Sequence, residues 1–370
     1  MRPFDVAFAI PGDLDAATGG YAYARQVLRY FPEHGIIGHH IRLPASFPDP
    51  TPDDVAHTAG LLDQIHPETP ILFDGLAFGA LPEELVAQVK SPIVALVHHP
   101  LAREAGHSPE RQRQLEASEK AALAHASQIV TTSAMTAATL ISEYNVRSDR
   151  ITVAEPGTAP AARAVGTRNP LSMLSVGALV PRKGYGVLIE ALSALAADAD
   201  QTGARSGDWP DDWSGNWHCT IVGTPEHDPA EANRLREQIM ATGLRSRITL
   251  AGRVEAAELT RLYAAADLFV LPSLYEGYGM VLAEAMARGL PIICTTGGAA
   301  AETAPDAAAL KVAPGDAAAL HRAIRTVVVD PETRQTMADC SWAAGQELPR
   351  WHDSVGRIAK VLKASVELDR

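Results

Sequence analysis

The segment Leu268–Ile293 constrains the fold of this chain more than any other stretch of the sequence. It opens with the apolar run Leu268–Leu271, which is typical of a buried parallel strand. A glycine-bearing loop leads into the helix-forming stretch 280–288, and a second apolar run follows Gly289, a residue type that commonly ends helices. A strand, a helix and a parallel strand form a βαβ unit, so we expect a doubly wound α/β fold. Ligands of such folds bind at the carboxyl ends of the strands.

Two carboxylates flank the start of the predicted helix. Glu276 lies in the loop before it and Glu284 lies inside it, with seven residues between them. The backbone amides at the helix start belong to Gly277, Tyr278, Gly279 and Met280. Amides in such a place lack helical acceptors and carry partial positive charge, which suits a phosphate. One carboxylate could then bind the hydroxyls of a ribose and the other those of a sugar, although the same spacing also fits a helix cap and a solvated glutamate.

The residues PSLYEGYG around Glu276 and EAMARGLPII from Glu284 resemble the E-x7-E motif of retaining glycosyltransferases of family 4. That family has the GT-B architecture, in which two Rossmann-like domains face an interdomain cleft. The resemblance implies that Glu276 contacts hydroxyls of the donor sugar and that Glu284 holds the ribose of the nucleotide. It covers nearly the whole chain, but its motifs are specific only in Leu174–Gly184 and Asp267–Gly298.

A second motif carries two adjacent cations, Arg182 and Lys183, in a predicted strand-to-helix turn. In isolation such a pair is typical of a solvated turn. The stretch VGALVPRKG, however, resembles the segment of the same family that binds the donor diphosphate, and this implies the same role for both residues. A bidentate guanidinium and a compact ammonium suit the negative charges of a diphosphate.

A pair of glycines, Gly19 and Gly20, directly precedes a helix that we expect from about Tyr21 to Phe31. The pair follows the predicted strand Phe4–Ile10, so the helix amides can face an anion or a polar substrate. In the resembled family a glycine-rich loop at this point lies in the interdomain cleft. The resemblance therefore implies a substrate-binding role for both glycines.

Two neighbouring histidines, His98 and His99, follow the apolar run Ile93–Val97. An isolated histidine after a strand is more often structural, but this edge of a doubly wound sheet is where ligands bind. Members of the resembled family have a histidine here that reaches the reacting sugar. The resemblance implies a catalytic role for His98, with His99 as the alternative.

The length of 370 residues suits two α/β domains. We expect an N-terminal acceptor-side domain over residues 1–160 and a C-terminal nucleotide-sugar domain over residues 161–350. By resemblance, a last helix at about 351–370 crosses back to pack on the N-terminal domain. The polar insertion 198–217, which contains three tryptophans, is predicted to be a surface loop.

Composition excludes several classes of partner. The net charge of −12 argues against non-specific binding of nucleic acid. Residues 1–165 carry 12 basic and 19 acidic side chains, and no basic run suggests docking to anionic lipid. The apolar run before Pro11 is too short for a signal peptide or a membrane span, so we expect a cytoplasmic protein. The widely spaced Cys219, Cys294 and Cys340 are expected to be reduced and buried.

The resemblance implies a retaining glycosyltransferase that moves a sugar from a nucleotide-diphosphate donor to an acceptor hydroxyl. No D-x-D metal motif follows a predicted strand, so we expect no metal and no cofactor beyond the donor, for which a UDP-sugar is the commonest choice. Two alternatives stay open: a non-catalytic two-domain protein that binds a sugar or nucleotide, and a nucleotide-sugar epimerase of the GT-B type. A dehydrogenase is disfavoured because PGDLDAATGG does not match G-x-G-x-x-G.

Overall fold

The chain folds into two compact units. The computed structural model describes residues 4–16, 18–104, 106–167, 169–201 and 215–368, so most of the predicted polar insertion lies outside the described residues. Unit 1 comprises Met1–Gly157 and Pro349–Arg370, and unit 2 comprises Thr158–Leu348. The chain passes between the units after residues 157 and 348. The boundaries predicted from the sequence lie slightly later, after residues 160 and 350.

Unit 1 is built on a parallel six-stranded sheet with the order β2-β1-β3-β4-β5-β6. The strands are β1 Phe4–Pro11, β2 Ile36–Leu43, β3 Ile71–Asp74, β4 Ile93–Val97, β5 Gln128–Thr131 and β6 Ile151–Val153. The helices are α1 Gly19–Tyr30, α2 Pro52–Leu62, α3 Gly75–Phe78, α4 Glu83–Val86, α5 Pro109–His125, α6 Ala134–Tyr144 and α14 Trp351–Leu368. The chain winds in opposite directions from β1 and β3, so the topological switch point lies between these two strands.

Unit 2 has a second parallel six-stranded sheet, with the order β12-β11-β10-β7-β8-β9. The strands are β7 Leu171–Val176, β8 Trp217–Val222, β9 Ile248–Gly252, β10 Leu268–Leu271, β11 Ile292–Thr295 and β12 Ala309–Val312. The helices are α7 Tyr185–Gln201, α8 Pro229–Ala241, α9 Ala256–Ala265, α10 Met280–Met286, α11 Ala300–Thr303, α12 Ala317–Val329 and α13 Pro331–Gln346. This is the strand order of a Rossmann fold, with its switch point between β7 and β10.

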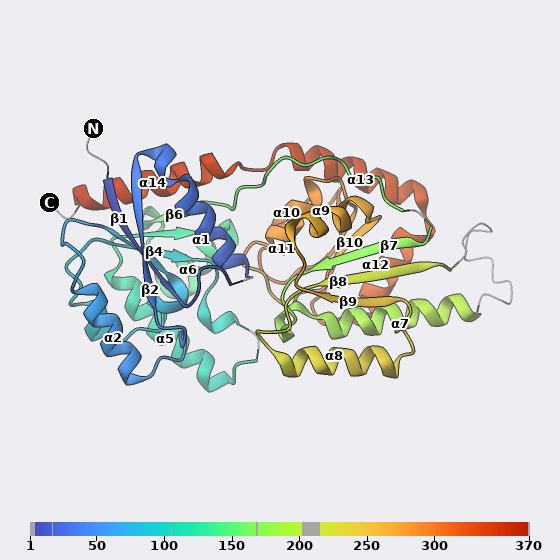
Figure 1. Ribbon diagram of the computed structural model, residues 1–370, viewed down its shortest axis with the longest axis horizontal. Coiled ribbons are helices and arrows are strands. Elements are labelled where there is room, and N and C mark those ends of the chain that lie inside the picture. Colours follow the sequence, from blue (N-terminus) through green and yellow to red (C-terminus); the bar gives the residue numbers. More distant parts are fainter. Residues whose placement is uncertain (1–3, 17, 105, 168, 202–214, 369–370) are drawn as a thin grey trace. The chain divides into compact units, whose positions relative to one another are not determined.

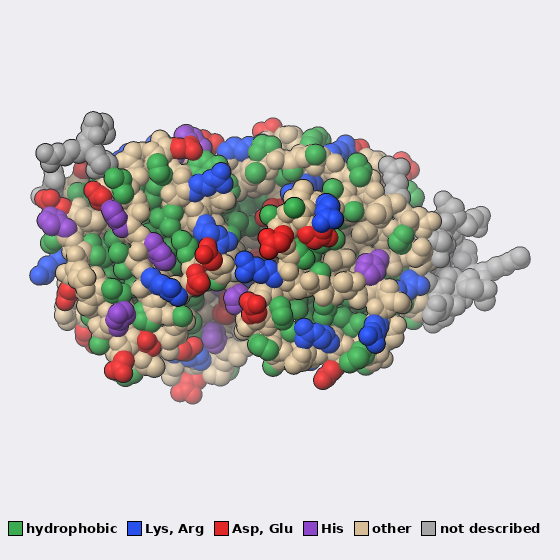
Figure 2. Space-filling view, viewed as in Figure 1, with side chains coloured by type: hydrophobic (Ala, Val, Ile, Leu, Met, Phe, Trp, Pro, Cys, Tyr) green, Lys and Arg blue, Asp and Glu red, His purple; other side chains and the backbone are tan. Residues whose placement is uncertain are grey.

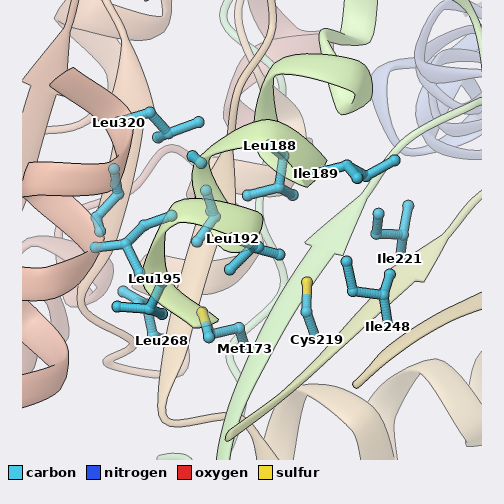
Figure 3. Packing of buried hydrophobic residues seen from close by; sticks show 14 of the residues in the cluster. Met173, Leu188, Ile189, Leu192, Leu195, Cys219, Ile221, Ile248, Leu268 and Leu320 are labelled. Atoms are coloured by element: carbon cyan, nitrogen blue, oxygen red, sulfur yellow. The ribbon is translucent and has the colours of Figure 1, made fainter. Parts of the chain in front are cut away.

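Helices cover both faces of the unit 2 sheet. One apolar cluster joins α7, α8 and α12 to the sheet, and another joins α9 and α10 to it (Figure 1). Figure 3 shows Leu188, Leu192 and Leu195 of α7 beside Met173 of β7 and Leu268 of β10. Apolar residues three and four apart give α7 this buried face, and each fully buried leucine stabilises the fold by about 1.5–3 kcal/mol. The core therefore fixes the start of α7, which directly follows the predicted cation turn.

The C-terminal helix α14 belongs to unit 1. It packs against α1, β4 and β6 (Figure 1), and buries Val355, Ile358 and Leu362. A Cβ atom at Gly157 would lie 2.2 Å from the backbone nitrogen of Trp351, so the last turn of unit 1 before unit 2 requires a glycine against this helix. The return of the chain to unit 1 is as expected for the final helix.

Some elements differ from the sequence-based expectation. The proline- and aspartate-rich stretch after β2 ends in a helix, because Pro52 begins α2 and Thr51 caps it through a capping box with Asp54. Strand β2 and helix α13 were not anticipated. The β2 sequence IIGHHIRL is polar at its centre because the strand lies at the edge of the sheet, where β1 is its single neighbour among the described strands.

The surface carries both signs of charge in close mixture. Figure 2 shows lysine and arginine side chains alternating with aspartate and glutamate over the visible face. Cys219 and Cys294 are buried free thiols, whereas the free thiol Cys340 is only partly buried, contrary to the expectation of burial. Within the described ranges, every helix is too short or too polar to cross a membrane.

Candidate functional site

The loops after β7 and β10 meet at the switch point of unit 2. The turn after β7 contains a 3₁₀ helix, Pro181–Lys183, and ends at Gly184 in the left-handed conformation with φ 67°. A Cβ atom at Gly184 would lie 2.1 Å from the carbonyl oxygen of Pro272, so only glycine permits this approach. The Leu274 amide donates a hydrogen bond of 2.7 Å to the Arg182 carbonyl. The turn and the loop after β10 therefore form one packed structure.

A buried ion cluster joins the predicted diphosphate-binding cations to Glu276, which is 6% exposed. Lys183 Nζ lies 2.6 Å from Glu276 Oε1, and Arg182 Nη1 lies 3.7 Å from Oε2. Arg182 also donates a hydrogen bond of 2.7 Å to the Tyr275 carbonyl, and Ser273 Oγ donates one of 2.5 Å to Glu276 Oε1. Burial opposes ionisation of Glu276, but the two cations and the Ser273 hydroxyl outweigh it and lower its pKa.

The backbone of Glu276 is fixed as firmly as its side chain. Its amide donates to the Gly297 carbonyl at 3.2 Å, and its carbonyl accepts from the Ala299 amide at 2.8 Å. Gly298 forms a parallel bridge with Glu276 at φ 66°, and a Cβ atom there would lie 2.2 Å from the Glu276 carbonyl oxygen. The close approach of the Gly298 backbone on one side of Glu276 thus holds its carboxylate against Arg182 and Lys183 on the other side.

Helix α10 starts at Met280, close to the position predicted from the sequence. Gly279 precedes it in the left-handed conformation, with φ 87°. Among the residues that the structure describes, the amides of Gly277, Gly279 and Met280 donate no hydrogen bond to the protein. Tyr278 is buried, and its carbonyl accepts from the Thr303 hydroxyl at 2.6 Å. The loop therefore holds open amide donors directly after Glu276.

Glu284 lies on the second turn of α10 in a separate network. The Tyr263 hydroxyl donates to its Oε2 at 2.9 Å, and Arg288 donates to its backbone carbonyl at 2.9 Å. Burial raises the pKa of Glu284, while Tyr263 and Arg288 lower it in part. In the described part of the chain Glu284 shares no hydrogen bond or ion pair with the cation turn. The structure thus brings Arg182, Lys183 and Glu276 together and gives Glu284 partners of its own.

In unit 1 the predicted glycines lie after β1, beside the switch point. Helix α1 begins at Gly19, two residues before the expected start at Tyr21, because the Thr18 side chain caps it by accepting from the Tyr21 amide. Gly19 and Gly20 are therefore the first turn of the helix, and the prediction that they precede it was wrong. A Cβ atom at Gly20 would lie 3.6 Å from His98 Nε2, whereas one at Gly19 would meet nothing within 4 Å.

His98 lies at the carboxyl end of β4, with its ring edge-on to Tyr23 at a centroid distance of 5.3 Å. Its Nε2 is buried and has no hydrogen-bond partner in the described residues, and lies 3.8 Å from Asp74 Oδ2. His99 instead bonds to Glu104, at 3.2 Å. Of the two histidines, His98 is the one that lies beside Gly20.

Asp74 is a candidate that the sequence interpretation missed. It is buried, ends β3, and caps α3 by accepting from the Leu76 amide at 2.9 Å. Its second oxygen is the one that faces His98. The signal was available, because Asp74 follows the apolar run ILF just as His98 follows IVALV, and parallel strands end at one edge of a sheet.

Comparison with known proteins gives one family match. Residues 163–340 match the model of the family described as glycosyl transferases group 1. Mannosylfructose-phosphate synthase of Agrobacterium fabrum is 34% identical over 34% of this chain and 25% of its own length. D-inositol 3-phosphate glycosyltransferase of Corynebacterium glutamicum is 31% identical over 55% of this chain and 51% of its own. The alignments thus span about half or less of these two relatives.

Solved structures are similar over nearly the whole chain. Sucrose-phosphate synthase of Thermosynechococcus elongatus aligns with a TM-score of 0.80 at 21% identity and covers 98% of each chain. Anabaena HepE in complex with UDP-glucose aligns with a TM-score of 0.73 at 17% identity, over 97% of this chain and 99% of that one. At these identities the likeness concerns the fold, and it confirms the two-domain Rossmann-like α/β class predicted from the sequence.

The family match lies within unit 2. It contains both segments on which the sequence resemblance depends, 174–184 and 267–298, together with the ion cluster around Glu276. The match agrees with the resemblance to a glycosyltransferase, and residues 163–340 of this chain are similar to the glycosyl transferases of group 1.

Proposed function

We propose that this protein is a metal-independent, retaining glycosyltransferase that uses a nucleotide-diphosphate sugar. The observation that carries the proposal is the ion cluster at the switch point of unit 2, where Arg182, Lys183 and Glu276 meet beside open backbone amides. Such a switch point is where Rossmann-like sheets bind nucleotides. Two cations and unpaired amides complement a diphosphate, and a carboxylate beside them complements sugar hydroxyls.

In the proposed reaction the bond between the anomeric carbon and the diphosphate oxygen breaks, and its electron pair stays on the diphosphate. The acceptor oxygen bonds to the anomeric carbon, and its proton passes to the departing diphosphate. Negative charge therefore grows on the leaving group while positive charge grows on the sugar ring. Arg182 and Lys183 are suited to stabilise the leaving group, because they are already held in place before the reaction starts. Removing one such donor typically lowers turnover 10²- to 10³-fold.

The remaining roles follow the sequence predictions. Glu276 orients the donor sugar through its hydroxyls, and Glu284 binds the ribose. In unit 1 the proposed roles are substrate binding for Gly19 and Gly20 and catalysis for His98. The position of Gly20 next to the unpartnered Nε2 of His98 supports a shared role for these two residues. Asp74, 3.8 Å from His98, is suited to accept a hydrogen bond from a substrate hydroxyl.

The relatives suggest where to look for substrates. HepE was solved with UDP-glucose, which supports a UDP-sugar as the first donor to test. Two curated relatives are named as a mannosylfructose-phosphate synthase and a D-inositol 3-phosphate glycosyltransferase. Both names contain a phosphorylated small molecule, so we propose a phosphorylated polyol or sugar as the first acceptor class.

The first experiment is a thermal-shift screen with UDP-, GDP-, ADP- and TDP-sugars, because a ligand of the folded state raises its stability. The stabilising donor is then assayed for transfer with acceptors that include inositol 3-phosphate, with and without EDTA. We expect EDTA to leave transfer unchanged, whereas loss of activity that Mg²⁺ or Mn²⁺ restores would contradict metal independence.

Site variants complete the test. We expect Arg182→Ala and Glu284→Ala to abolish transfer while the melting curve stays cooperative. Arg236→Ala is the matched control, since Arg236 is an exposed residue of α8 in the same unit and bonds only to Asn233 in the described structure. Normal transfer by Arg182→Ala and Glu284→Ala would refute the proposed site, and donor binding without any transfer would favour a non-catalytic binding protein.

A further inference from the structure

Each of the two predicted substrate-binding carboxylates accepts a hydrogen bond from one fully buried hydroxyl. Ser273 donates to Oε1 of Glu276 at 2.5 Å, and Tyr263 donates to Oε2 of Glu284 at 2.9 Å. Both donors are 0% exposed. We infer that Ser273 and Tyr263 are positioning residues, which anchor one oxygen of each carboxylate and leave the other oxygen for a hydroxyl of the donor. This inference rests on the proposed function.

The two oxygens of Glu276 have different surroundings. Oε1 accepts from both Lys183 and Ser273, at 2.6 and 2.5 Å. The only described partner of Oε2 is Arg182 at 3.7 Å, which is an ion-pair distance and too long for a hydrogen bond. A carboxylate has about four lone-pair positions, so Oε2 retains the capacity to accept from a substrate hydroxyl.

Ser273 is itself held in place. The Thr295 hydroxyl donates to its carbonyl, and the Gly297 amide donates to Thr295 Oγ1 at 3.3 Å. Gly297 also accepts from the Glu276 amide, which closes the network around the loop. The position of the Ser273 hydroxyl is therefore fixed, and its hydrogen bond sets the orientation of the Glu276 carboxylate.

Tyr263 has an equally fixed ring. Phe269 stacks against it at a centroid distance of 5.8 Å and an angle of 19°, and the Arg288 guanidinium lies 4.4 Å from its centroid. Arg288 bonds to the backbone carbonyl of Glu284 and not to its carboxylate. In the described part of the chain Oε1 of Glu284 has no hydrogen-bond partner. Tyr263 thus sets the direction of this carboxylate and leaves one oxygen open.

The same contacts would also exist if both hydroxyls only stabilised a polar core. A positioning role and a purely structural role predict different effects on ligand binding when the hydroxyl oxygen is removed. Ser273→Ala and Tyr263→Phe remove the hydroxyls and change little else. Ser175→Ala is the matched control for the serine, because Ser175 is fully buried on β7 and its hydroxyl lies by the Tyr185 hydroxyl and not by either of the two carboxylates. Tyr144→Phe is the control for the tyrosine, because its hydroxyl lies by the buried carboxyl of Glu119 in unit 1.

The experiment measures, by calorimetry, the dissociation constants of the free nucleoside diphosphate and of the corresponding nucleotide sugar. We expect Tyr263→Phe to weaken both ligands by the same factor, about 10- to 100-fold, because a hydrogen bond that orients a ribose-binding group serves both. Ser273→Ala should weaken only the nucleotide sugar by about that factor. It should also move the acid limb of the pH profile of kcat/KM to higher pH, because the lost hydroxyl stabilised the ionised form of Glu276.

The inference is tested by comparing how each variant changes the dissociation constants of the two ligands. Equal effects of Ser273→Ala on both ligands, or effects no larger than those of the two controls, would overturn it. If that result is obtained while wild-type protein transfers sugar and Arg182→Ala does not, the positioning roles are refuted and the proposed function stands. If wild-type protein binds neither ligand, the proposed function fails and the positioning roles fail with it.

Discussion

The ligand edges of the two units are built in opposite ways. In unit 2 the carboxylate of Glu276 has three side-chain partners, and glycines allow backbone approach on both sides of its loop. In unit 1 the Nε2 of His98 has no hydrogen-bond partner in the described residues, and Asp74 stands 3.8 Å away. The proposed diphosphate site needs cations fixed in advance, and the dense packing of the first edge agrees with that proposal. The second edge keeps unused polar capacity, which would suit the neutral hydroxyl of the proposed substrate.

The largest expected difference between the edges concerns charge. Lys183→Met leaves Glu276 buried with Arg182 as its one remaining cation, so we expect the free energy of unfolding at pH 7 to fall by about 3–5 kcal/mol. Asp74→Asn in unit 1 keeps the acceptor for the Leu76 amide and should change stability by less than about 1 kcal/mol. Denaturant titration of both variants measures the contrast.

The double variant Lys183→Met with Glu276→Gln is the control for this charge effect. It removes both partners of the pair and should recover most of the lost stability, since an uncompensated charge is then no longer buried. An equal loss in the single and double variants would mean that packing around Lys183, rather than its charge, stabilises this edge.

A smaller contrast is expected from the glycines. Gly298→Ala must place a Cβ atom 2.2 Å from the Glu276 carbonyl oxygen at a positive φ, so we expect a loss of at least about 2 kcal/mol. Gly20→Ala meets only ordinary contacts at 3.6 Å, and alanine is the better helix former by up to about 1 kcal/mol. The melting temperature should therefore fall in Gly298→Ala and rise in Gly20→Ala. Equal shifts in the two variants would show that the two edges are packed alike.

The last contrast is a pH dependence of opposite sign in the two units. Burial raises the pKa of Glu119 in α5 to about 8, although the Leu101 amide and the Tyr144 hydroxyl lower it in part. The native state then keeps a proton that the unfolded state loses, so stability falls from about pH 4.5 to pH 8. The lowered pKa of Glu276 acts in the reverse sense, and its contribution is lost only as pH falls below the normal value of 4.5.

Glu119→Gln separates these contributions. It should be more stable than the wild type at pH 8, and the difference should grow by up to about 1.4 kcal/mol per pH unit between pH 5 and 8. Thermal unfolding at several pH values measures this growth. A constant difference across the range would show that Glu119 ionises normally in the folded protein.

The same contrast explains what could be predicted from the sequence. Around Glu276 the structure requires glycines and opposite charges within two short segments, so a local motif was enough to identify Arg182, Lys183 and Glu276 as one group. His98 was found only through its place after a strand, and Asp74, which is equivalent in position, was passed over because a lone aspartate after a three-residue apolar run is common.

Other features depend on partners distant in sequence. Tyr263 precedes Glu284 by 21 residues, and nothing in α9 marks its hydroxyl as the partner of a carboxylate. Ser273 looked like an ordinary loop serine until the loop geometry set its hydroxyl on Oε1 of Glu276. Strand β2 was missed because an edge strand with one neighbour needs little hydrophobic patterning.

Helix α14 has a consequence for the order in which the protein is made. Ribosomes release a chain from its amino terminus, and domains generally fold as they emerge. Unit 2 has its whole sequence once residue 348 has been synthesised, but unit 1 still lacks Val355, Ile358 and Leu362 at that moment. The unit that is begun first is thus the last to be completed, and a premature stop near residue 350 would leave its apolar surface uncovered while sparing its neighbour.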